Sequence, residues 1–316
     1  CVGGTDGWGG YVKKATANIS GTADSATSLV GIFGNGSNGG SDEVIGTLTG
    51  CTFTSMAGGY DTEIASINRG HVKDVTLNFN KCIFPESVIA YIGGTKGWKK
   101  DYKSSGVEVV SPGTVSFSFN ECTNTPTLGL SDGLDNANVT VAGAPVQVAS
   151  FDNDMDATKK AFTIATGKTW NLNGGLTFAT GDNAATLTNG GTLNVTASTS
   201  AMLQDALTAG ANKVNLDATN FELASNLEIT NPIALVGTVG AENAITTITQ
   251  ASQAETATAG DNLVTIKATK NVSLENIKIT KSDNYGLHVF NSDSVRLTNV
   301  TLSDNKAGGL FVNGST

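Results

Sequence analysis

Charged side chains are scarce in this chain of 316 residues: they make up 15% of it, and the formal net charge is −9. Helical bundles need abundant Glu, Lys and Leu, so a sequence rich in Gly, Thr, Asn, Ser and Ala argues against a mainly helical protein. The densest group of lysines comprises Lys96, Lys99, Lys100 and Lys103. Contact with nucleic-acid phosphates requires a broader basic surface, so we expect no nucleic-acid partner.

Long apolar runs and closely spaced metal or redox ligands are also lacking. The sequence contains no run of about 18 apolar residues, and we therefore expect no membrane-spanning segment in this chain. The four cysteines include no Cys-x-x-Cys pair, and the two histidines are His71 and His288. Zinc and dithiol sites need closer spacing of such residues, so we expect no cofactor of that kind.

What the sequence does contain is an internal repeat near its C-terminal end. Apolar residues alternate there, which is the spacing of strands and not of helices. The residues Val272, Leu274, Asn276, Ile277, Ile279, Gly286, Leu287 and Val289 recur 23 positions later as Val295, Leu297, Asn299, Val300, Leu302, Gly309, Leu310 and Val312. Self-similarity at a fixed period is typical of solenoids, in which each coil buries its apolar face against its neighbours. We therefore predict an all-β protein, a parallel β-helix or β-solenoid.

The run Val-x-Leu-x-Asn-Ile-x-Ile from Val272 to Ile279 is followed by a polar turn and by Gly-Leu-x-Val from Gly286 to Val289. This pattern resembles the right-handed parallel β-helix of the pectate-lyase-like superfamily, an architecture shared by bacterial surface adhesins and autotransporter passengers. The resemblance covers residues 200–316 and implies a right-handed coil. It implies little about function, because many unrelated activities use one architecture.

Residues 1–130 carry a second, longer and looser repeat, in which a glycine-rich strand is followed by an alternating strand that ends near a cysteine. If the register is correct, Cys51, Cys82 and Cys122 stack in one column. Adjacent members of such a column lie at a separation that a disulfide permits. Small, buried, unreacted thiols fit the same column, and we favour that interpretation.

Residues 200–210 interrupt the strands. Their apolar residues Met202, Leu203, Ala206 and Leu207 are spaced for one helix face. Ser200 can cap the start, and Gly210 ends the pattern. We predict a short capping helix near 201–209, glycine-rich β-solenoid repeats over 1–199, and a right-handed parallel β-helix over 200–316 that is truncated at its C-terminal end.

The two ends of the chain fall inside repeats. The segment Gly3–Trp8 matches Gly93–Trp98, and Thr316 follows directly on a strand pattern. Open solenoid ends normally carry a cap, so we expect the chain to be a piece of a larger polypeptide.

Few residues suggest catalysis. In polysaccharide lyases of the resembling architecture, an Arg or Lys removes a proton and carboxylates hold Ca²⁺ against an acidic sugar. Arg69 and Arg296 are the two arginines; Arg296 alternates outward, with Asp283, Asp293 and Asp304 in nearby turns. Any β-helix surface shows such an arrangement, so we assign no catalytic residue. The paired aspartates and Gly-His-Gly run of the resembling glycosidases do not occur.

One acidic turn is a candidate metal site. Asp152, Asp154 and Asp156 alternate, which places their oxygens on one side of a turning backbone and suits Ca²⁺. A solvated acidic turn fits the same residues better, because the loop lacks the glycine and the closing Glu of an EF-hand.

The remaining polar and aromatic candidates favour structural roles. His288 alternates outward and is expected to be solvated, like His71, which lies beside Arg69. Asn276 and Asn299 are expected to form a hydrogen-bonded ladder. The aromatic residues Trp8, Trp98, Tyr60, Tyr91 and Tyr102 could stack on sugars, but the repeat equivalence of the two tryptophans favours a place in the core.

Taken together, these features favour a non-catalytic, secreted bacterial surface protein, an adhesin or passenger-like β-helix. Its expected partners are extracellular glycans or host and matrix proteins. Assembly with further copies of the same chain is a second kind of interaction that the sequence allows. Two alternatives remain open: a carbohydrate-active enzyme, either a polysaccharide lyase or a glycoside hydrolase, and a structural surface-layer or fibre component. A cluster of carboxylates, or of Arg and Lys, in one groove on the outer face of 260–316 would favour the enzyme.

Overall fold

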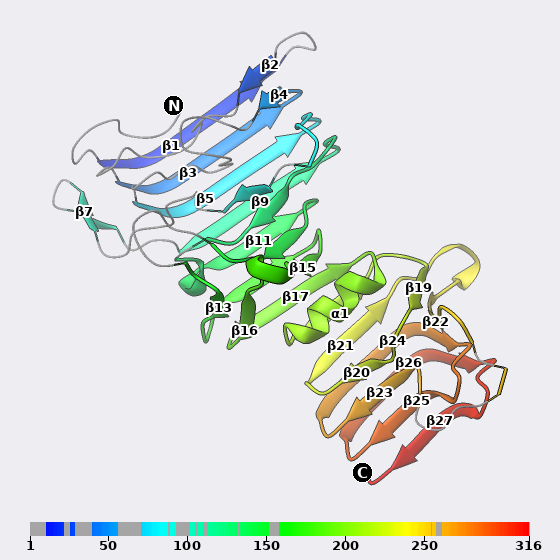
Figure 1. Ribbon diagram of the computed structural model, residues 1–316. Helices are drawn as coiled ribbons and strands as arrows, with labels where there is room; N and C mark the ends of the chain where they lie inside the picture. The colour runs from blue at the N-terminus through cyan, green and yellow to red at the C-terminus, as the bar shows by residue number, and fades with distance from the viewer. Residues whose placement is uncertain are drawn as a thin grey trace. The chain divides into compact units, whose positions relative to one another are not determined.

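The computed structural model describes residues 11–21, 26–28, 40–55, 71–87, 89–92, 102–104, 107–109, 113–131, 133–151, 158–253, 255–256 and 261–315. The chain divides into two compact units, Cys1–Leu193 and Asn194–Thr316, whereas the boundary predicted from the sequence is near residue 199. Strands occur throughout both units (Figure 1), and the described residues include a single α-helix. The protein is therefore all-β, as the sequence predicts.

In the first unit, six described strands lie side by side, parallel and in chain order (Figure 1). They are β1 (Tyr11–Ser20), β3 (Gly40–Thr49), β5 (His71–Asn80), β9 (Thr114–Asn120), β11 (Asn138–Ala142) and β14 (Thr169–Leu172). Between them the chain contributes to a second parallel sheet, β6 (Ile89–Tyr91), β10 (Thr127–Gly129), β12 (Val146–Val148) and β15 (Leu176–Phe178).

Smaller elements complete this unit. Two further parallel pairs are β2 (Ala26–Ser28) with β4 (Thr52–Ser55), and β13 (Ala161–Ile164) with β16 (Thr186–Asn189). The strands β7 (Tyr102–Ser104) and β8 (Val107–Val109) pair antiparallel. Short 3₁₀ turns are η1 (Leu134–Asn136) and η2 (Gly181–Asn183).

The core of the first unit consists of columns of like residues. Val44 lies opposite Val75, and Val75 lies opposite Val115. In a neighbouring column the rings of Phe79 and Phe119 stack with their centroids 4.9 Å apart. All five side chains are buried. Alternation of apolar and polar residues sends every second side chain inward, and parallel register then places equivalent side chains on top of each other.

The second unit uses the same arrangement. One group of parallel strands comprises β17 (Thr192–Ala197), β18 (Lys213–Leu216), β21 (Ile233–Gly237), β24 (Lys270–Thr280), β26 (Asp293–Ser303), β22 (Thr246–Gln250) and β19 (Asn220–Leu223). A second sheet is formed by β20 (Leu227–Ile229), β23 (Val264–Lys267), β25 (Tyr285–Phe290) and β27 (Gly308–Asn313). The 3₁₀ turn η3 (Ala241–Asn243) precedes β22. From residue 264 onward the chain alternates between the two sheets.

The 23-residue register predicted from the sequence is confirmed. Leu274 on β24 is the parallel partner of Leu297 on β26, and Leu287 on β25 is the partner of Leu310 on β27. The predicted asparagine ladder is also present, because Asn299 Nδ2 donates to Asn276 Oδ1 over 2.8 Å. Both asparagines have a positive φ, a conformation that Asn tolerates better than most residues.

The predicted helix is present as α1 (Ser200–Thr208), with Leu203 and Ala206 buried. Its N-terminal cap differs from the expectation. The Oγ1 of Thr199, and not that of Ser200, accepts a hydrogen bond from the backbone N–H of Met202, because Thr199 has the extended backbone that a cap requires. Gly210, with φ +69°, ends the helix as predicted. No helix among the described residues is long and apolar enough to cross a membrane.

Candidate functional site

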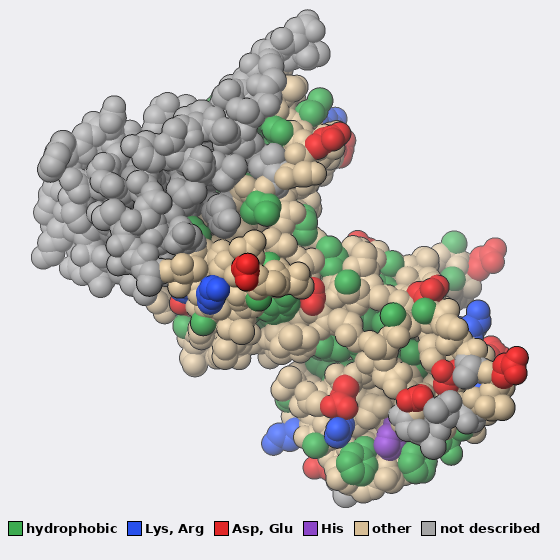
Figure 2. Space-filling model, in the orientation of Figure 1, with side chains coloured by type: hydrophobic (Ala, Val, Ile, Leu, Met, Phe, Trp, Pro, Cys, Tyr) green, Lys and Arg blue, Asp and Glu red, His purple; other side chains and the backbone are tan. Residues whose placement is uncertain are grey.

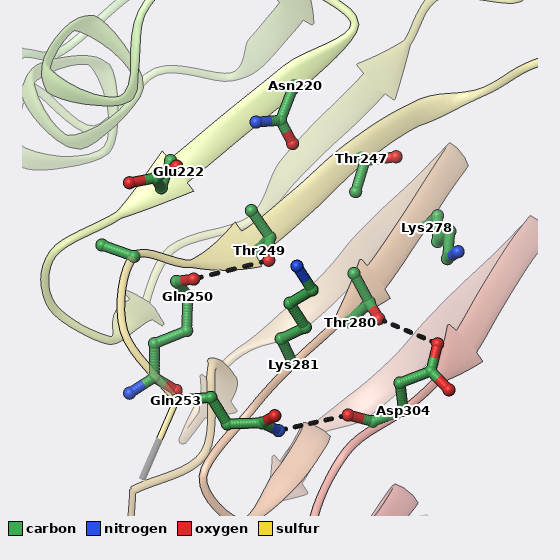
Figure 3. A pocket seen from close by; sticks show the side chains of 11 residues that line it. Asn220, Glu222, Thr247, Thr249, Gln250, Gln253, Lys278, Thr280, Lys281 and Asp304 are labelled. Carbon is green, nitrogen blue, oxygen red and sulfur yellow. Dashed lines mark hydrogen bonds between the residues drawn. The ribbon is translucent and has the colours of Figure 1, made fainter.

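A polar groove of about 600 Å³ lies on the outer surface of the second unit (Figure 3). It crosses β19, β22 and β24 and reaches the turn after β26. Its lining combines hydroxyl, amide, ammonium and carboxylate groups, supplied by Asn220, Glu222, Thr247, Thr249, Gln250, Gln253, Lys278, Thr280, Lys281 and Asp304, with Ala251.

Strand register produces the floor of this groove. Glu222 lies opposite Thr249, and Thr249 lies opposite Thr280, so the three side chains form one column across three strands. The intervening residues Phe221 and Ile248 are fully buried on the opposite face. Alternation therefore sends the apolar side chains into the core and the polar ones into the groove.

Hydrogen bonds to backbone and side chains hold one rim in place. Gln253 Nε2 donates to the carbonyl oxygens of Ser282 and Asp304 over 3.0 and 3.2 Å. Thr280 Oγ1 donates to Asp304 Oδ2 over 3.5 Å (Figure 3). These contacts join the segment after β22 to the turns that follow β24 and β26, so the groove wall is built from three successive layers of the chain.

A carboxylate beneath this rim is held by an amide. Gln250 Nε2 donates to Asp283 Oδ2 over 2.5 Å, and the backbone N–H of Asp283 donates to Gln250 Oε1 over 3.0 Å. Asp283 is only 8% exposed, so its carboxylate is already engaged and is not presented to a ligand. A buried carboxylate needs such partners to offset its lost hydration.

Two cations and two carboxylates face the groove. Figure 3 shows the Lys281 side chain extending between Thr249 and Thr280, whereas Glu222 and Asp304 lie on opposite sides. Within the described residues, neither Lys278 nor Lys281 forms an ion pair with a carboxylate; the lysines that do so include Lys159 and Lys267. An unpaired ammonium surrounded by hydroxyl and amide groups can donate to several ligand oxygens.

A cluster of aromatic side chains lies elsewhere in the same unit, on β25 and β27. The Phe311 ring stacks at 5.0 Å on both Tyr285 and His288, and His288 lies 5.8 Å from Phe290. Phe311 is 40% exposed. Flat aromatic faces next to polar groups suit the apolar faces of sugar rings.

His288 faces outward, as its position in the strand predicts, but it is half-buried in this cluster. Asn262 Nδ2 lies 3.2 Å from its Nδ1, and its Nε2 lies 2.8 Å from Asn313 Oδ1. Both ring nitrogens therefore lie within hydrogen-bond distance of asparagine amides.

The other site residues considered from the sequence have mixed outcomes. Arg296 is exposed on β26 and does not line the groove, whereas Asp304 does. The calcium candidates Asp152, Asp154 and Asp156 lie outside the described residues, as do Arg69, Tyr60, Trp8, Trp98, Lys96, Lys99 and Lys100 and the side chains of His71, Tyr91, Tyr102 and Lys103. Among the described residues, no three His, Cys, Asp or Glu side chains are grouped as metal ligands.

Sequence reasoning missed the central groove residues Glu222, Thr249 and Lys281. Their strands align at separations of 27 and 31 residues, whereas the recognised repeat has a period of 23. The alternation of Asn220-Phe221-Glu222-Leu223 and of Thr247-Ile248-Thr249 was a usable signal for outward polar columns. The sequence alone could not align the two columns, because the intervening turns differ in length.

The cysteine column is present in the first unit. Cys51, Cys82 and Cys122 each follow a residue with positive φ, and each thiol is free. Burial raises the pKa of Cys82 to about 11; hydrogen bonds to backbone partly oppose this rise, and the neighbouring cysteines add to it. Burial also raises the pKa of Cys122. Protonated thiols are poor nucleophiles, so reaction at either cysteine depends on its small thiolate fraction.

The fold and the groove define a class: an all-β protein of stacked parallel strands with a polar outer groove. Charged side chains are scattered among polar and apolar atoms on the coloured part of the face in Figure 2.

No protein-family model, curated protein sequence or solved structure shows significant similarity to the chain.

Proposed function

We propose that the chain forms a right-handed parallel β-helix of the pectate-lyase-like kind, acting as a non-catalytic bacterial surface protein that binds extracellular glycans. Alternation of the chain between two parallel sheets after residue 264, with equivalent residues 23 positions apart, supports the coil. Each pair of strands then forms part of one turn, and the outer face of the stack is free to present binding groups.

The observation that carries the glycan proposal is the composition of the groove. Its lining groups are threonine hydroxyls, asparagine and glutamine amides, two lysines and the carboxylates of Glu222 and Asp304, supplied by parallel strands and the turns that follow them. A polyhydroxylated ligand offers both donors and acceptors, which such groups complement. The exposed Phe311 ring in the same unit adds a surface on which a sugar ring can stack.

Binding to a glycan array tests this proposal. The free ammonium of Lys281 is expected to donate to ligand oxygens, so Lys281→Ala should weaken binding about tenfold, the loss typical of one charge-assisted hydrogen bond. Lys213→Ala is the matched control, because Lys213 is an exposed lysine on β18 outside the groove and its replacement changes the net charge equally. An equal loss of glycan affinity in both variants, or the absence of any bound glycan, would contradict specific glycan binding in the groove.

A polysaccharide lyase is the second candidate, favoured by one observation. The groove brings Lys278 and Lys281 together with the carboxylates of Glu222 and Asp304, the kind of cluster that proton abstraction from an acidic sugar requires. Incubation with uronic-acid polysaccharides, followed by detection of unsaturated products, separates the two functions. Product that disappears in Lys281→Ala would establish the lyase and remove the non-catalytic proposal.

A further inference from the structure

The three free thiols of the first unit lie in consecutive layers. The backbone N–H of Ile83 donates to the carbonyl of Cys51, and the N–H of Thr123 donates to the carbonyl of Cys82, each over 2.9 Å. Thr52, Ile83 and Thr123 form parallel bridges, so the residues just before them, Cys51, Cys82 and Cys122, are stacked neighbours. Adjacent parallel strands are about 4.8 Å apart. That separation lies within the range of about 4.4–6.8 Å between the Cα atoms of a disulfide.

The three thiols point the same way along the column. Cys82 Sγ lies 3.5 Å from the carbonyl oxygens of Leu48 and Asn80, and Cys122 Sγ lies 3.4 Å from that of Phe79 and 3.5 Å from that of Asn120, so each thiol lies between its own layer and the layer before it. The Cys122 thiol therefore contacts the layer that contains Cys82.

Exposure distinguishes the members of the column. Cys82 is fully buried, Cys51 is 5% exposed, and Cys122 is half-buried. A small oxidant in solution therefore meets Cys122 first, and Cys82 is the thiol of the adjoining layer. Cys51 is separated from Cys122 by the layer of Cys82, so it cannot be the partner of Cys122.

We propose that Cys122 and Cys82 form an interlayer disulfide when the protein meets a small disulfide oxidant, and that Cys51 remains a thiol. The Cys122 thiolate attacks a low-molecular-weight disulfide, forms a mixed disulfide and releases one thiolate. The Cys82 thiolate then attacks the Cys122 sulfur and releases the second thiolate. Two protein thiols are oxidised, one external disulfide is reduced to two thiols, and the two protons lost by the protein thiols are taken up, through solvent, by the released thiolates. The new bond joins layers 40 residues apart in the chain.

Peptide mapping of the full chain tests this inference, in a Cys1→Ser background that removes the fourth cysteine. The reduced protein is incubated with oxidised glutathione, quenched with iodoacetamide and digested without reductant. The expected product is a Cys82–Cys122 linked peptide with alkylated Cys51. Because burial raises the pKa values of both thiols and the thiolate is the nucleophile, the rate should rise as the pH increases from 7 to 9.

Two variants complete the test. Cys51→Ser should leave the yield of the linked peptide within twofold, whereas Cys122→Ser should abolish it and leave Cys82 alkylated only after unfolding. Circular dichroism shows whether each variant is folded. A Cys51–Cys82 product, or a folded protein that carries stable glutathione on Cys122 without a linked peptide, would overturn the assignment. The inference does not depend on glycan binding, so the two can fail separately.

Discussion

At the scale of single residues, backbone conformation decides which side chains enter the core. Gly50, Lys81 and Glu121 have φ values of +65°, +53° and +51°, and each directly precedes a cysteine of the column. These left-handed residues bend the chain at the same place in successive layers. Lys81 and Glu121 adopt this conformation at a cost of about 1–2 kcal/mol each, which the burial of the following residues offsets.

Alkaline pH should destabilise the protein through Cys82. Its pKa is raised to about 11 in the folded state, whereas an unfolded cysteine has a pKa of about 8.5. Its contribution to stability is therefore complete below about pH 8.5 and is lost as the pH rises toward 11. Urea unfolding under reducing conditions should show a steeper fall in unfolding free energy above pH 8.5 for the wild type than for Cys82→Ala. Parallel curves would contradict this assignment.

At the scale of elements, α1 shows how little sequence is needed to specify a helix inside a strand-rich chain. The helix has buried Leu203 and Ala206 on one face, a threonine cap before it and Gly210 after it. The spacing of its apolar residues and the glycine that follows predicted the position of this helix correctly. The cap was assigned one residue too late, because Ser200 and Thr199 are both good capping residues and the choice depends on the backbone of the preceding turn.

Thr199→Ala should reveal the cap. Loss of the hydrogen bond from the Met202 N–H should lower the unfolding free energy by about 1 kcal/mol. Ser200→Ala is the matched control and should change it by less than about 0.5 kcal/mol. Thermal unfolding of both variants measures the difference. A larger loss for Ser200→Ala would show that the sequence-based assignment of the cap was correct.

At the scale of the whole molecule, stability comes from columns that pass through many layers. Leu274 is 1% exposed and stands between Leu235 and Leu297 in parallel register. Shortening one side chain in such a column removes its contacts to two neighbouring layers at once. Long-range stacking of this kind, and not local propensity, holds the parallel strands together.

Leu274→Ala should therefore lower the unfolding free energy by about 2–5 kcal/mol, the range found for large-to-small changes in packed cores. Val239→Ala serves as the control, because Val239 is 53% exposed and its truncation should cost less than about 0.5 kcal/mol. Denaturant unfolding of both variants provides the comparison. Similar values for the two would show that residue 274 is not in a stacked core.

The alternating pattern and the 23-residue period were sufficient to predict parallel strands, the pairing of Leu274 with Leu297 and the ladder of Asn276 on Asn299. These features follow from local periodicity, because a solenoid repeats the same contacts along the chain. The groove was not predictable in this way. Glu222, Thr249 and Lys281 come together only because turns of unequal length bring their strands into register. The length of a turn does not by itself indicate which residues of the two strands become neighbours.

Sequence therefore determined the strand type, the repeat and the inward residues, since each depends on side chains a few positions or one period apart. The tertiary structure decided which polar columns share a groove, that Asp283 is engaged by Gln250, and that His288 is enclosed by amides and rings. Those outcomes depend on distances between layers of the chain, which are set by packing and not by any local pattern.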